Sequence, residues 1–516
     1  MRSATLSMVL AVGLLAAMPG SGAAVPAEST VIEQDRSIQE ARESFADATA
    51  SHGAGDRRTL IAMSKLVSAY LDAEDYAAAA PLARELLSKL ERATPRDDAE
   101  IAAATGDVAQ VAEGEGRLEE AETLFRRSVA LAEQATGGSH RATALALNNL
   151  GSFLNAVNRS QEAEPIMRRA LHIRERTLGP SDPLTAQTLC TLGVIVFMQE
   201  DMLLAESLLR QSLAIRERMD PPARRSDLAE SQVALARLLL ATGRAEEANP
   251  LASEASVHYR GAFGPMHLPT QNAMHLWADT LAATGRTAES DRVHRDIIAA
   301  IESLSPPRPW LLAKALGDRG RHLLAAGDAA RALEVHRRAV AVSRKERGED
   351  GDASIPLRRY LAESLYANAL IDEAIAEGRG IVSVVEAADS RSLDTGAALV
   401  SLAKYLLAAD GAEEARPLIR RAIGILEETS GRSGEPALKA MSLLAMSFIA
   451  TDDLPEAEKV VDEAMDRYRA EPDIRSTEAI GEVIGLRGIL LRKAGRVSEA
   501  EEAEAVVRQI EADRYR

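Results

Sequence analysis

Small residues recur along this chain with a period far longer than a helical turn. Eleven of them follow one another at intervals of 41 to 43 residues: Ala79, Ala121, Ala163, Ala205, Ala248, Ser290, Ala332, Ala374, Ala415, Ala457 and Ala500. A fixed period of this length indicates a repeat architecture, in which each repeat buries its apolar side only against its neighbours. We call these residues the anchors.

Two further positions keep a fixed distance from most anchors. Twelve residues earlier stands another small residue, such as Gly151 or Gly193, and nine residues earlier a larger apolar one, such as Leu154 or Val196. The two small residues predict helices with closely approaching backbones, because a larger side chain would overpack the contact at a cost of about 1–3 kcal/mol. The larger residue belongs to an apolar stripe. Each repeat is therefore predicted to be a hairpin of two helices.

The connections carry turn signals. Five residues before the anchor stands a residue suited to the left-handed conformation that ends a helix, namely Gly116, Asn158, Gly243, Gly285, Gly327 or Gly495. Loops between repeats contain glycine and proline, which stop helices. The stiffest of these loops, Ser305–Pro309, is interpreted as either a lengthened loop or a slight bend between two halves of the array. Before the array, the pattern predicts a lone capping helix within residues 36–55, and the repeats then run over 59–516.

Two consecutive repeats have nearly the same sequence at several positions. Asn149-Leu150-Gly151, Ala163-Glu164 and Arg174-Glu175-Arg176 correspond to Thr191-Leu192-Gly193, Ala205-Glu206 and Arg216-Glu217-Arg218, and the linker between them reads Leu178-Gly179-Pro180-Ser181-Asp182-Pro183. This resembles the tetratricopeptide repeat of the kinesin light chain type. The resemblance implies an all-α fold, a right-handed α-solenoid of about eleven helix-turn-helix repeats. In this family the first helix of each repeat lines a concave groove.

Composition narrows the classes of function. The chain is 46% hydrophobic, 27% charged and 3% aromatic, with a formal net charge of −17. Such an acidic surface repels phosphate backbones, so we expect no nucleic-acid partner. The one cysteine, Cys190, excludes an intramolecular disulfide. Scattered histidines, and the lack of a glycine-rich phosphate loop or a Cys-x-x-Cys pair, predict no metal, no cofactor and no enzyme.

The N-terminus reads as a targeting segment. Arg2 precedes an apolar run from Leu6 to Met18, and small residues then favour cleavage after Ala24. The run is too short to span a membrane at about 20 residues. Residues 1–24 are therefore predicted to be a secretory signal peptide, and 25–35 a flexible linker. We expect a periplasmic or secreted protein without stable membrane insertion after cleavage.

Candidate binding residues follow from the resemblance. Aligned with the family groove, the third repeat offers Asn148, Asn149, Ser152 and Asn155. Asn149 matches a family asparagine that contacts peptide backbones, since an amide both donates and accepts. Equivalent positions hold Asp107, Thr191 and Asp318, so the asparagine ladder is interrupted.

A second pattern lies eleven residues before successive anchors, where the charge alternates: Arg237, Asp279, Arg321, Glu363 and Lys404. These groups form either intramolecular ion pairs, each worth about 0–1 kcal/mol when exposed, or contacts to a polar peptide. Further candidates on this face are Asn272, Lys314, Arg359, Tyr360 and Tyr366. Towards the C-terminus the face turns apolar at Met446, Ile449 and Ile489, which would suit an amphipathic partner helix if the helical phase is right.

The sequence thus predicts a non-enzymatic protein-interaction scaffold that binds a peptide or a helical segment of a protein partner in its concave groove. The alternative is an accessory subunit of a bacterial envelope assembly or secretion complex that docks through loops or its convex face. A hydrolase with an unrecognised site is the third possibility.

Overall fold

The computed structural model describes residues 28–73, 75–219, 225–305, 307–347, 354–470 and 477–513. Within these ranges the chain forms twenty-three α-helices and no strand, which confirms the predicted all-α class. The predicted signal peptide lies outside the described residues. The helices are α2 (Glu28–His52), α3 (Arg57–Asp72), α4 (Tyr76–Arg92), α5 (Asp98–Gly114), α6 (Leu118–Thr136), α7 (Arg141–Ala156), α8 (Ser160–Thr177), α9 (Pro183–Met198), α10 (Met202–Glu217), α11 (Arg225–Ala241), α12 (Ala245–Phe263), α13 (Leu268–Ala283), α14 (Thr287–Glu302), α15 (Pro309–Ala325), α16 (Ala329–Arg347), α17 (Ile355–Ala367), α18 (Ile371–Ala388), α19 (Leu393–Ala408), α20 (Ala412–Ser430), α21 (Glu435–Ala450), α22 (Leu454–Ala470), α23 (Thr477–Lys493) and α24 (Val497–Asp513).

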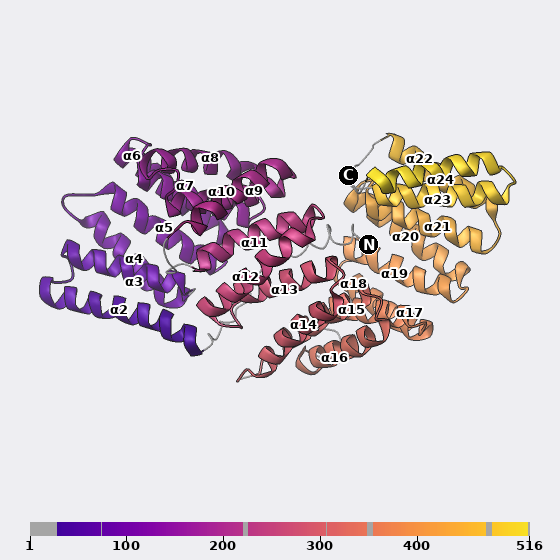
Figure 1. The fold of residues 1–516 in the computed structure, drawn as a ribbon, viewed down its shortest axis with the longest axis horizontal. Coiled ribbons are helices and arrows are strands. Elements are labelled where there is room, and N and C mark those ends of the chain that lie inside the picture. The colour runs from indigo at the N-terminus through magenta and orange to yellow at the C-terminus, as the bar shows by residue number, and fades with distance from the viewer. Residues whose placement is uncertain are drawn as a thin grey trace. The chain divides into compact units, whose positions relative to one another are not determined.

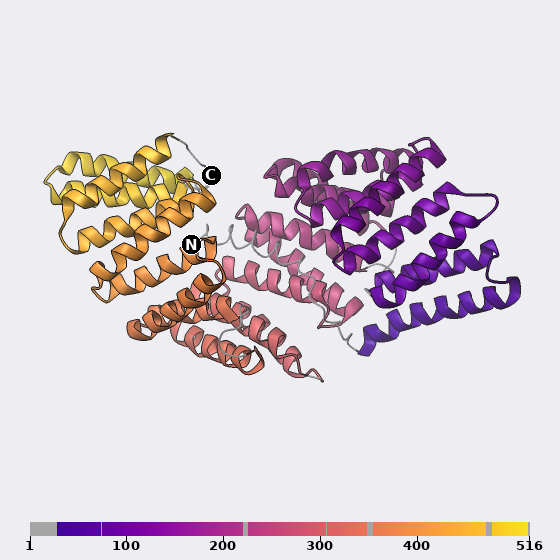
Figure 2. The same cartoon turned by 180° about the vertical axis from the view of Figure 1, so that it is seen from behind.

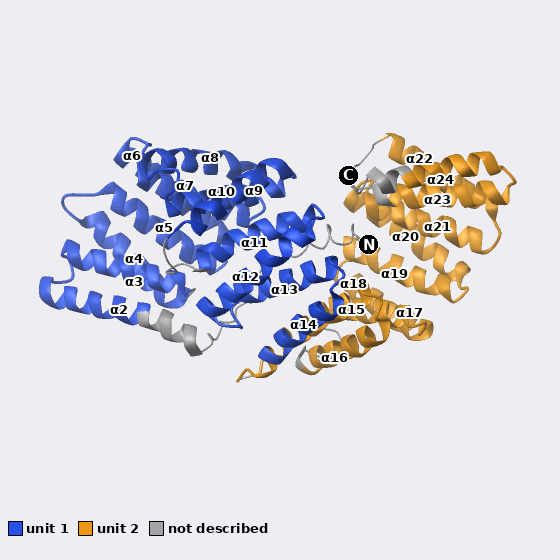
Figure 3. Ribbon diagram, in the orientation of Figure 1, with its two compact units in different colours: residues 1–300 blue, residues 301–516 orange. Residues whose placement is uncertain are grey.

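Helix α2 precedes the array and packs on α3, and the later helices follow in pairs from α3/α4 to α23/α24, one pair for each anchor. Within each of the two units described below, Figures 1 and 2 show the helix pairs stacked side by side. The chain divides into two compact units, Met1–Ala300 and Ile301–Arg516 (Figure 3), and the division falls just before Ser305–Pro309. No helix within the described ranges combines the length and apolarity that a membrane span requires.

The first helix starts earlier than the sequence pattern predicts. Residues 25–35 are predicted to be a flexible linker, but α2 begins at Glu28 and so includes residues 28–35 as well as most of the predicted cap. No glycine or proline lies between Glu28 and His52 to stop the helix, and polar residues with moderate helix propensity continue it.

The core of each repeat is centred on its anchor. Every anchor is buried, with an exposed fraction of at most 2%. At Gly151 an added Cβ would lie 2.4 Å from Sδ of Met167 and 3.7 Å from the carbonyl oxygen of Ala163. The small residues therefore face each other across the hairpin as predicted, and Gly151 leaves room for the side chain of Met167.

The turn inside the hairpin has one geometry throughout the described repeats. Gly285 has a φ of +77°, and the other predicted turn glycines and Asn158 also have positive φ. Four residues without this sequence signal adopt the same conformation: Glu200, Ala369, Asp410 and Asp452. The backbone N–H of the residue that follows the left-handed residue donates to the carbonyl oxygen of the residue nine positions before the anchor. In the third repeat, for example, Arg159 N donates to Leu154 O at 2.8 Å. This bond, made in every such turn, holds the left-handed residue in place whatever its side chain.

The first helices form the inner layer of each unit. Neighbouring first helices contact each other, as α5 with α7 in unit 1 and α19 with α21 in unit 2, whereas second helices make no comparable contacts in the described part of the chain. Because a curved two-layer array brings its helices closest on the concave side, the first helices line that side.

Candidate protein-interaction surface

Each first helix of the second to fourth repeats exposes one narrow stripe. In α5 every residue from Ile101 to Ala112 is buried except Ala103, Asp107 and Gln110, and in α7 the same pattern exposes Leu145, Asn149 and Ser152. These residues lie 18, 14 and 11 positions before the anchor, so they share one helical face. We call these three positions of each first helix the inner stripe.

Four half-buried polar side chains on the stripes of α5 and α7 have no internal partner. Within the described residues Asp107, Gln110, Asn149 and Ser152 make no side-chain hydrogen bond and no ion pair. We call them the free polar set. The Asn149 amide lies over α5, with Nδ2 3.8 Å from the point that a Cβ of Gly106 would occupy. Unsatisfied polar groups in a half-buried setting carry a desolvation cost that a ligand can relieve.

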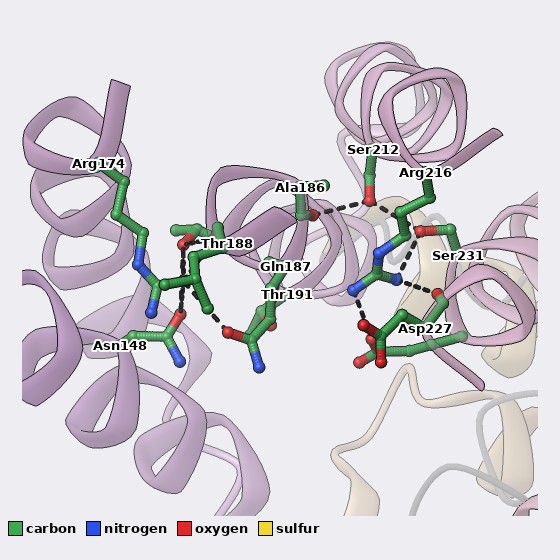
Figure 4. Close-up of polar contacts among 12 residues, drawn as sticks. Asn148, Arg174, Ala186, Gln187, Thr188, Thr191, Ser212, Arg216, Asp227 and Ser231 are labelled. Carbon is green, nitrogen blue, oxygen red and sulfur yellow. Dashed lines mark hydrogen bonds and ion pairs between the residues drawn. The ribbon is translucent and has the colours of Figure 1, made fainter. Parts of the chain in front are cut away.

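Asn148, although adjacent to Asn149, is committed to the core. It is only 5% exposed, and its Oδ1 accepts hydrogen bonds from Arg174 Nη1 and Thr188 Oγ1, each at 3.3 Å (Figure 4). The prediction that Asn148 faces the groove is therefore wrong, because a one-residue step on a helix turns the side chain by about 100°.

The buried guanidinium of Arg174, on α8, is the group for which Asn148 serves as a hydrogen-bond acceptor. It is 1% exposed and also donates to Thr188 Oγ1 at 2.6 Å on α9. Burial lowers the pKa of Arg174 to about 10, against the opposing effect of Asp182. The equivalent Arg216 joins α10 to α11 by donating to Ser231 Oγ at 2.7 Å (Figure 4). It also donates to Glu230 Oε2 at 2.8 Å. Two buried arginines thus fasten successive repeats of unit 1.

The other unit 1 candidates are half-buried. Asn155 accepts a hydrogen bond from Ser160 Oγ at 3.0 Å. Arg237 on α11 and Asp279 on α13 attract each other, and burial lowers the pKa of Arg237 while Asp279 opposes that shift. Asn272 occupies the first stripe position of α13. Of the candidates in this unit, the structure brings Asn149 next to α5 and couples Arg237 to Asp279.

The stripe of unit 2 is largely satisfied from within. Asp318 accepts from Arg321 Nη2 at 2.8 Å and from Lys314 Nζ at 3.2 Å. Arg359 Nη1 donates to Asp394 Oδ1 at 2.9 Å. Ion pairing, one of the two interpretations of the alternating charges, thus describes these groups in the structure.

Glu363 is the centre of the polar contacts between α17 and α19. Its carboxylate accepts from Lys404 Nζ at 3.0 Å and from the Tyr405 hydroxyl at 3.1 Å. Lys404 also lies 4.5 Å from the ring centre of Tyr366, and the Tyr360 ring stacks on His336 at 5.6 Å. A small cavity beside Glu363 is lined by Arg359, Ala362, Gly378, Ile381, Ala398, Ser401 and Tyr405.

The last described first helices expose apolar side chains on the stripe. Met446 on α21 is 50% exposed and Ile489 on α23 is 48% exposed, while Ile449 is half-buried. The helical phase inferred from the sequence is thus correct here. Helices α21 and α23 contact each other directly, so the two side chains belong to one apolar strip in unit 2.

Charges on the second helices pair across repeats. Arg169 on α8 reaches Glu133 on α6 at 2.5 Å, Arg244 at the start of α12 reaches Glu206 on α10 at 2.8 Å, and Arg379 on α18 reaches Glu414 on α20 at 2.6 Å. Pairs of this kind are worth about 0–1 kcal/mol each when exposed. In these pairs each charged group already has a partner of opposite charge.

The inner stripes, the paired second helices and the left-handed hairpin turns define a class, the α-solenoid of helical repeats. The family model of the tetratricopeptide repeat matches residues 100–176 and 143–218. Residues 100–218 of this chain therefore consist of tetratricopeptide repeats. Such repeats form scaffolds that typically mediate protein interactions and are in general not enzymes.

Solved structures are similar at low identity. BtubC (BKLC) from P. vanneervenii is 21% identical over 45% of this chain and 90% of its own, with a TM-score of 0.36. A putative kinesin light chain repeat protein of Podosopora anserina is 21% identical over 40% of this chain and 95% of its own, with a TM-score of 0.34. Aspartyl phosphate phosphatase F from Bacillus subtilis is 15% identical over 72% of this chain and 94% of its own, with a TM-score of 0.41. No curated protein matches the sequence.

Proposed function

We propose that this protein is an interaction scaffold that binds an extended peptide of a protein partner along the inner stripe of unit 1, over α5 and α7. The observation that supports this site most is the free polar set. Asp107, Gln110, Asn149 and Ser152 line one narrow face, are half-buried, and leave their hydrogen-bonding groups unused within the described residues.

A peptide backbone complements these groups chemically. Each peptide unit presents one N–H donor and one carbonyl acceptor, and the amides of Gln110 and Asn149 each offer both functions. Apolar contact is available on the same stripes, where Leu145 is 45% exposed and Ile61 on α3 is 47% exposed. Binding would then combine backbone hydrogen bonds with small apolar contacts, without covalent chemistry.

Docking through the convex face has less support as an alternative. There, pairs such as Arg169–Glu133 and Arg379–Glu414 already satisfy the charged groups. A partner would have to break these pairs to use them, whereas the free polar set is available without such a cost.

The test uses a random 12-residue peptide display library selected on the full chain, followed by affinity measurements with the selected peptides. We expect Asn149→Ala to weaken binding about tenfold, from the loss of one or two hydrogen bonds. The matched control is Gln211→Ala on α10, which removes an exposed amide from a second helix. Equal affinity for both variants, or no selected peptide at all, would contradict the proposal.

The apolar strip of unit 2 supports a second site, for the apolar face of a partner helix. Met446 and Ile489 are about half exposed on adjacent first helices. The probe is a library of amphipathic helical peptides. Met446→Asp and Ile489→Asp should abolish binding, whereas Val506→Asp, which changes an equally exposed residue on second helix α24, should not. Retained binding in the first two variants would exclude this site.

We also propose that residues 1–24 are removed on export and that the protein acts in the periplasm or outside the cell. N-terminal sequencing of the protein isolated from its source cells tests this, with Val25 as the expected first residue. An intact Met1 would contradict it.

A further inference from the structure

Asp107 and Asp318 occupy the same inner-stripe position in two different repeats, fourteen residues before the anchors Ala121 and Ala332. On α15, Asp318 lies between two cations, with Lys314 one turn before it and Arg321 one turn after it. Both contact its carboxylate, at 3.2 and 2.8 Å. Asp318 thus shows how a carboxylate at this stripe position is satisfied in unit 2.

On α5 both of those cations are missing. The position of Lys314 is held by Ala103, and that of Arg321 by Gln110. Ala103 is exposed and short, so it leaves open the space that a lysine side chain fills on α15. Among the described residues Asp107 has no hydrogen bond and no ion pair, and Lys65 on the neighbouring stripe of α3 forms none with it.

The surroundings make the unpaired carboxylate costly. Burial alone raises the pKa of Asp107 to about 7. Burial also raises the pKa of Glu113, further along the same helix. A positively charged group beside Asp107 would favour its ionised form and form a charge-assisted hydrogen bond. The stripe therefore lacks what Lys314 and Arg321 supply on α15.

We infer that the peptide bound over α5 and α7 carries a lysine or arginine whose side chain occupies the place above Ala103 and contacts the carboxylate of Asp107. This inference rests on the proposed function and specifies the chemistry of the ligand. The amides of Gln110 and Asn149 hold the peptide backbone, and Asp107 selects one side chain. A strongly acidic chain thereby selects basic segments of its partner.

The experiment uses the full chain and a positional-scanning library of nine-residue peptides, in which one position at a time is fixed as Lys, Arg, Gln, Asp or Glu. Captured peptides are quantified by mass spectrometry. For the unmodified protein we expect about tenfold enrichment of Lys or Arg over Gln at one position, the effect of a charge-assisted hydrogen bond.

Three variants make the result specific. Asp107→Asn should lose the enrichment while still binding peptides through the amides. Asp107→Lys should reverse the preference, to Asp and Glu. Ala103→Lys introduces on α5 the cation that Lys314 supplies on α15. The new lysine should pair with the Asp107 carboxylate and so remove the preference for Lys or Arg in the peptide. Circular dichroism confirms that each variant keeps its helices.

The outcomes separate the two proposals. Peptide capture without a basic preference, or a preference that persists in Asp107→Asn, overturns the inference about Asp107 and leaves the peptide site standing. Absence of any peptide capture by the unmodified protein overturns the proposed function and with it this inference.

Discussion

Two sets of inner stripes can be compared, those of α5 and α7 in unit 1 and those of α15, α17 and α19 in unit 2. All five helices are first helices of the same type of repeat, but their polar side chains differ in whether they have internal partners. On α15, Asp318 is held by Lys314 and Arg321, and on α17 Glu363 is held by Lys404 and Tyr405. On α5 and α7 the equivalent groups have no such contacts within the described residues. Side chains one turn away satisfy Asp318, and side chains of the next first helix satisfy Glu363. The side chains around a stripe thus decide whether it is satisfied internally or left for a ligand.

The difference can be tested most strongly at Glu363. Glu363→Ala removes the carboxylate that accepts from the Tyr405 hydroxyl and pairs with Lys404. The Tyr405 side chain is buried, at 1% exposed. We expect the local free energy of opening of α17 and α19 to fall by about 1–3 kcal/mol, because a buried donor is left unsatisfied. Hydrogen exchange of these helices measures it. Glu363→Gln, which keeps an acceptor, should lose clearly less, and equal losses would mean that the hydrogen bond to Tyr405 contributes little.

Replacing Asp107 should stabilise the protein, whereas replacing Glu363 should destabilise it. Its pKa is raised to about 7 by burial, so the folded state binds the proton more tightly than the unfolded state. The corresponding stability is complete below about pH 4 and is lost as the pH rises to about 7. Asp107→Asn should therefore increase the free energy of unfolding by about 1–3 kcal/mol at pH 8 and change it little at pH 4. Urea titrations at both pH values measure this. A stability loss at pH 8 would show that the ionised carboxylate has an internal partner.

The hairpin turns should behave alike in the two units, which makes them a control for the comparison. Glu200 in unit 1 and Ala369 in unit 2 have φ of +67° and +57°. A left-handed residue with a side chain costs about 1 kcal/mol relative to glycine. Glu200→Gly and Ala369→Gly should each stabilise the protein by about 0.5–1 kcal/mol, measured by thermal unfolding. A gain at one turn and a loss at the other would indicate a side-chain contact peculiar to that turn.

The smallest effect is expected at Asn149. Because its amide has no internal hydrogen bond within the described residues, Asn149→Ala should change the free energy of unfolding by less than about 0.5 kcal/mol. The neighbouring Asn148→Ala should cost about 1–3 kcal/mol, since it leaves the buried Arg174 and Thr188 short of an acceptor. Urea unfolding of the two variants measures the contrast. A comparable loss in both would assign Asn149 to the core and remove it from the binding surface.

Several features of the fold could be predicted from residue types alone, because they depend on local size and local conformation. The period of small residues predicted the hairpins, and all eleven anchors are buried. Gly285 and Asn158 predicted left-handed turns, but Ala369 and Glu200 did not, since there the hydrogen bonds of the turn impose the conformation on unsuited residues. The start of α2 at Glu28 was missed for a related reason, as nothing in its sequence marks a helix boundary.

The candidate surface could be predicted only in part. Asn149 was found through the family resemblance, whereas Gln110 was missed although it lies eleven residues before its anchor, where a stripe residue belongs. Asn148 was assigned to the groove because adjacency in sequence does not resolve helical phase. The pattern of charges at Arg321, Glu363 and Lys404 could not tell an ion pair from a binding site, since both use the same residue types.

The sequence by itself determined the repeat and the helical class, because these follow from periodic size and polarity within about forty residues. Only the tertiary structure decided which polar groups on the inner stripes are already bonded. A hydrogen bond between side chains depends on distances of a few tenths of an ångström and on the rotamers of residues one repeat away. Glu363 therefore appears as part of the scaffold, and Asp107 as the group that a ligand would complete.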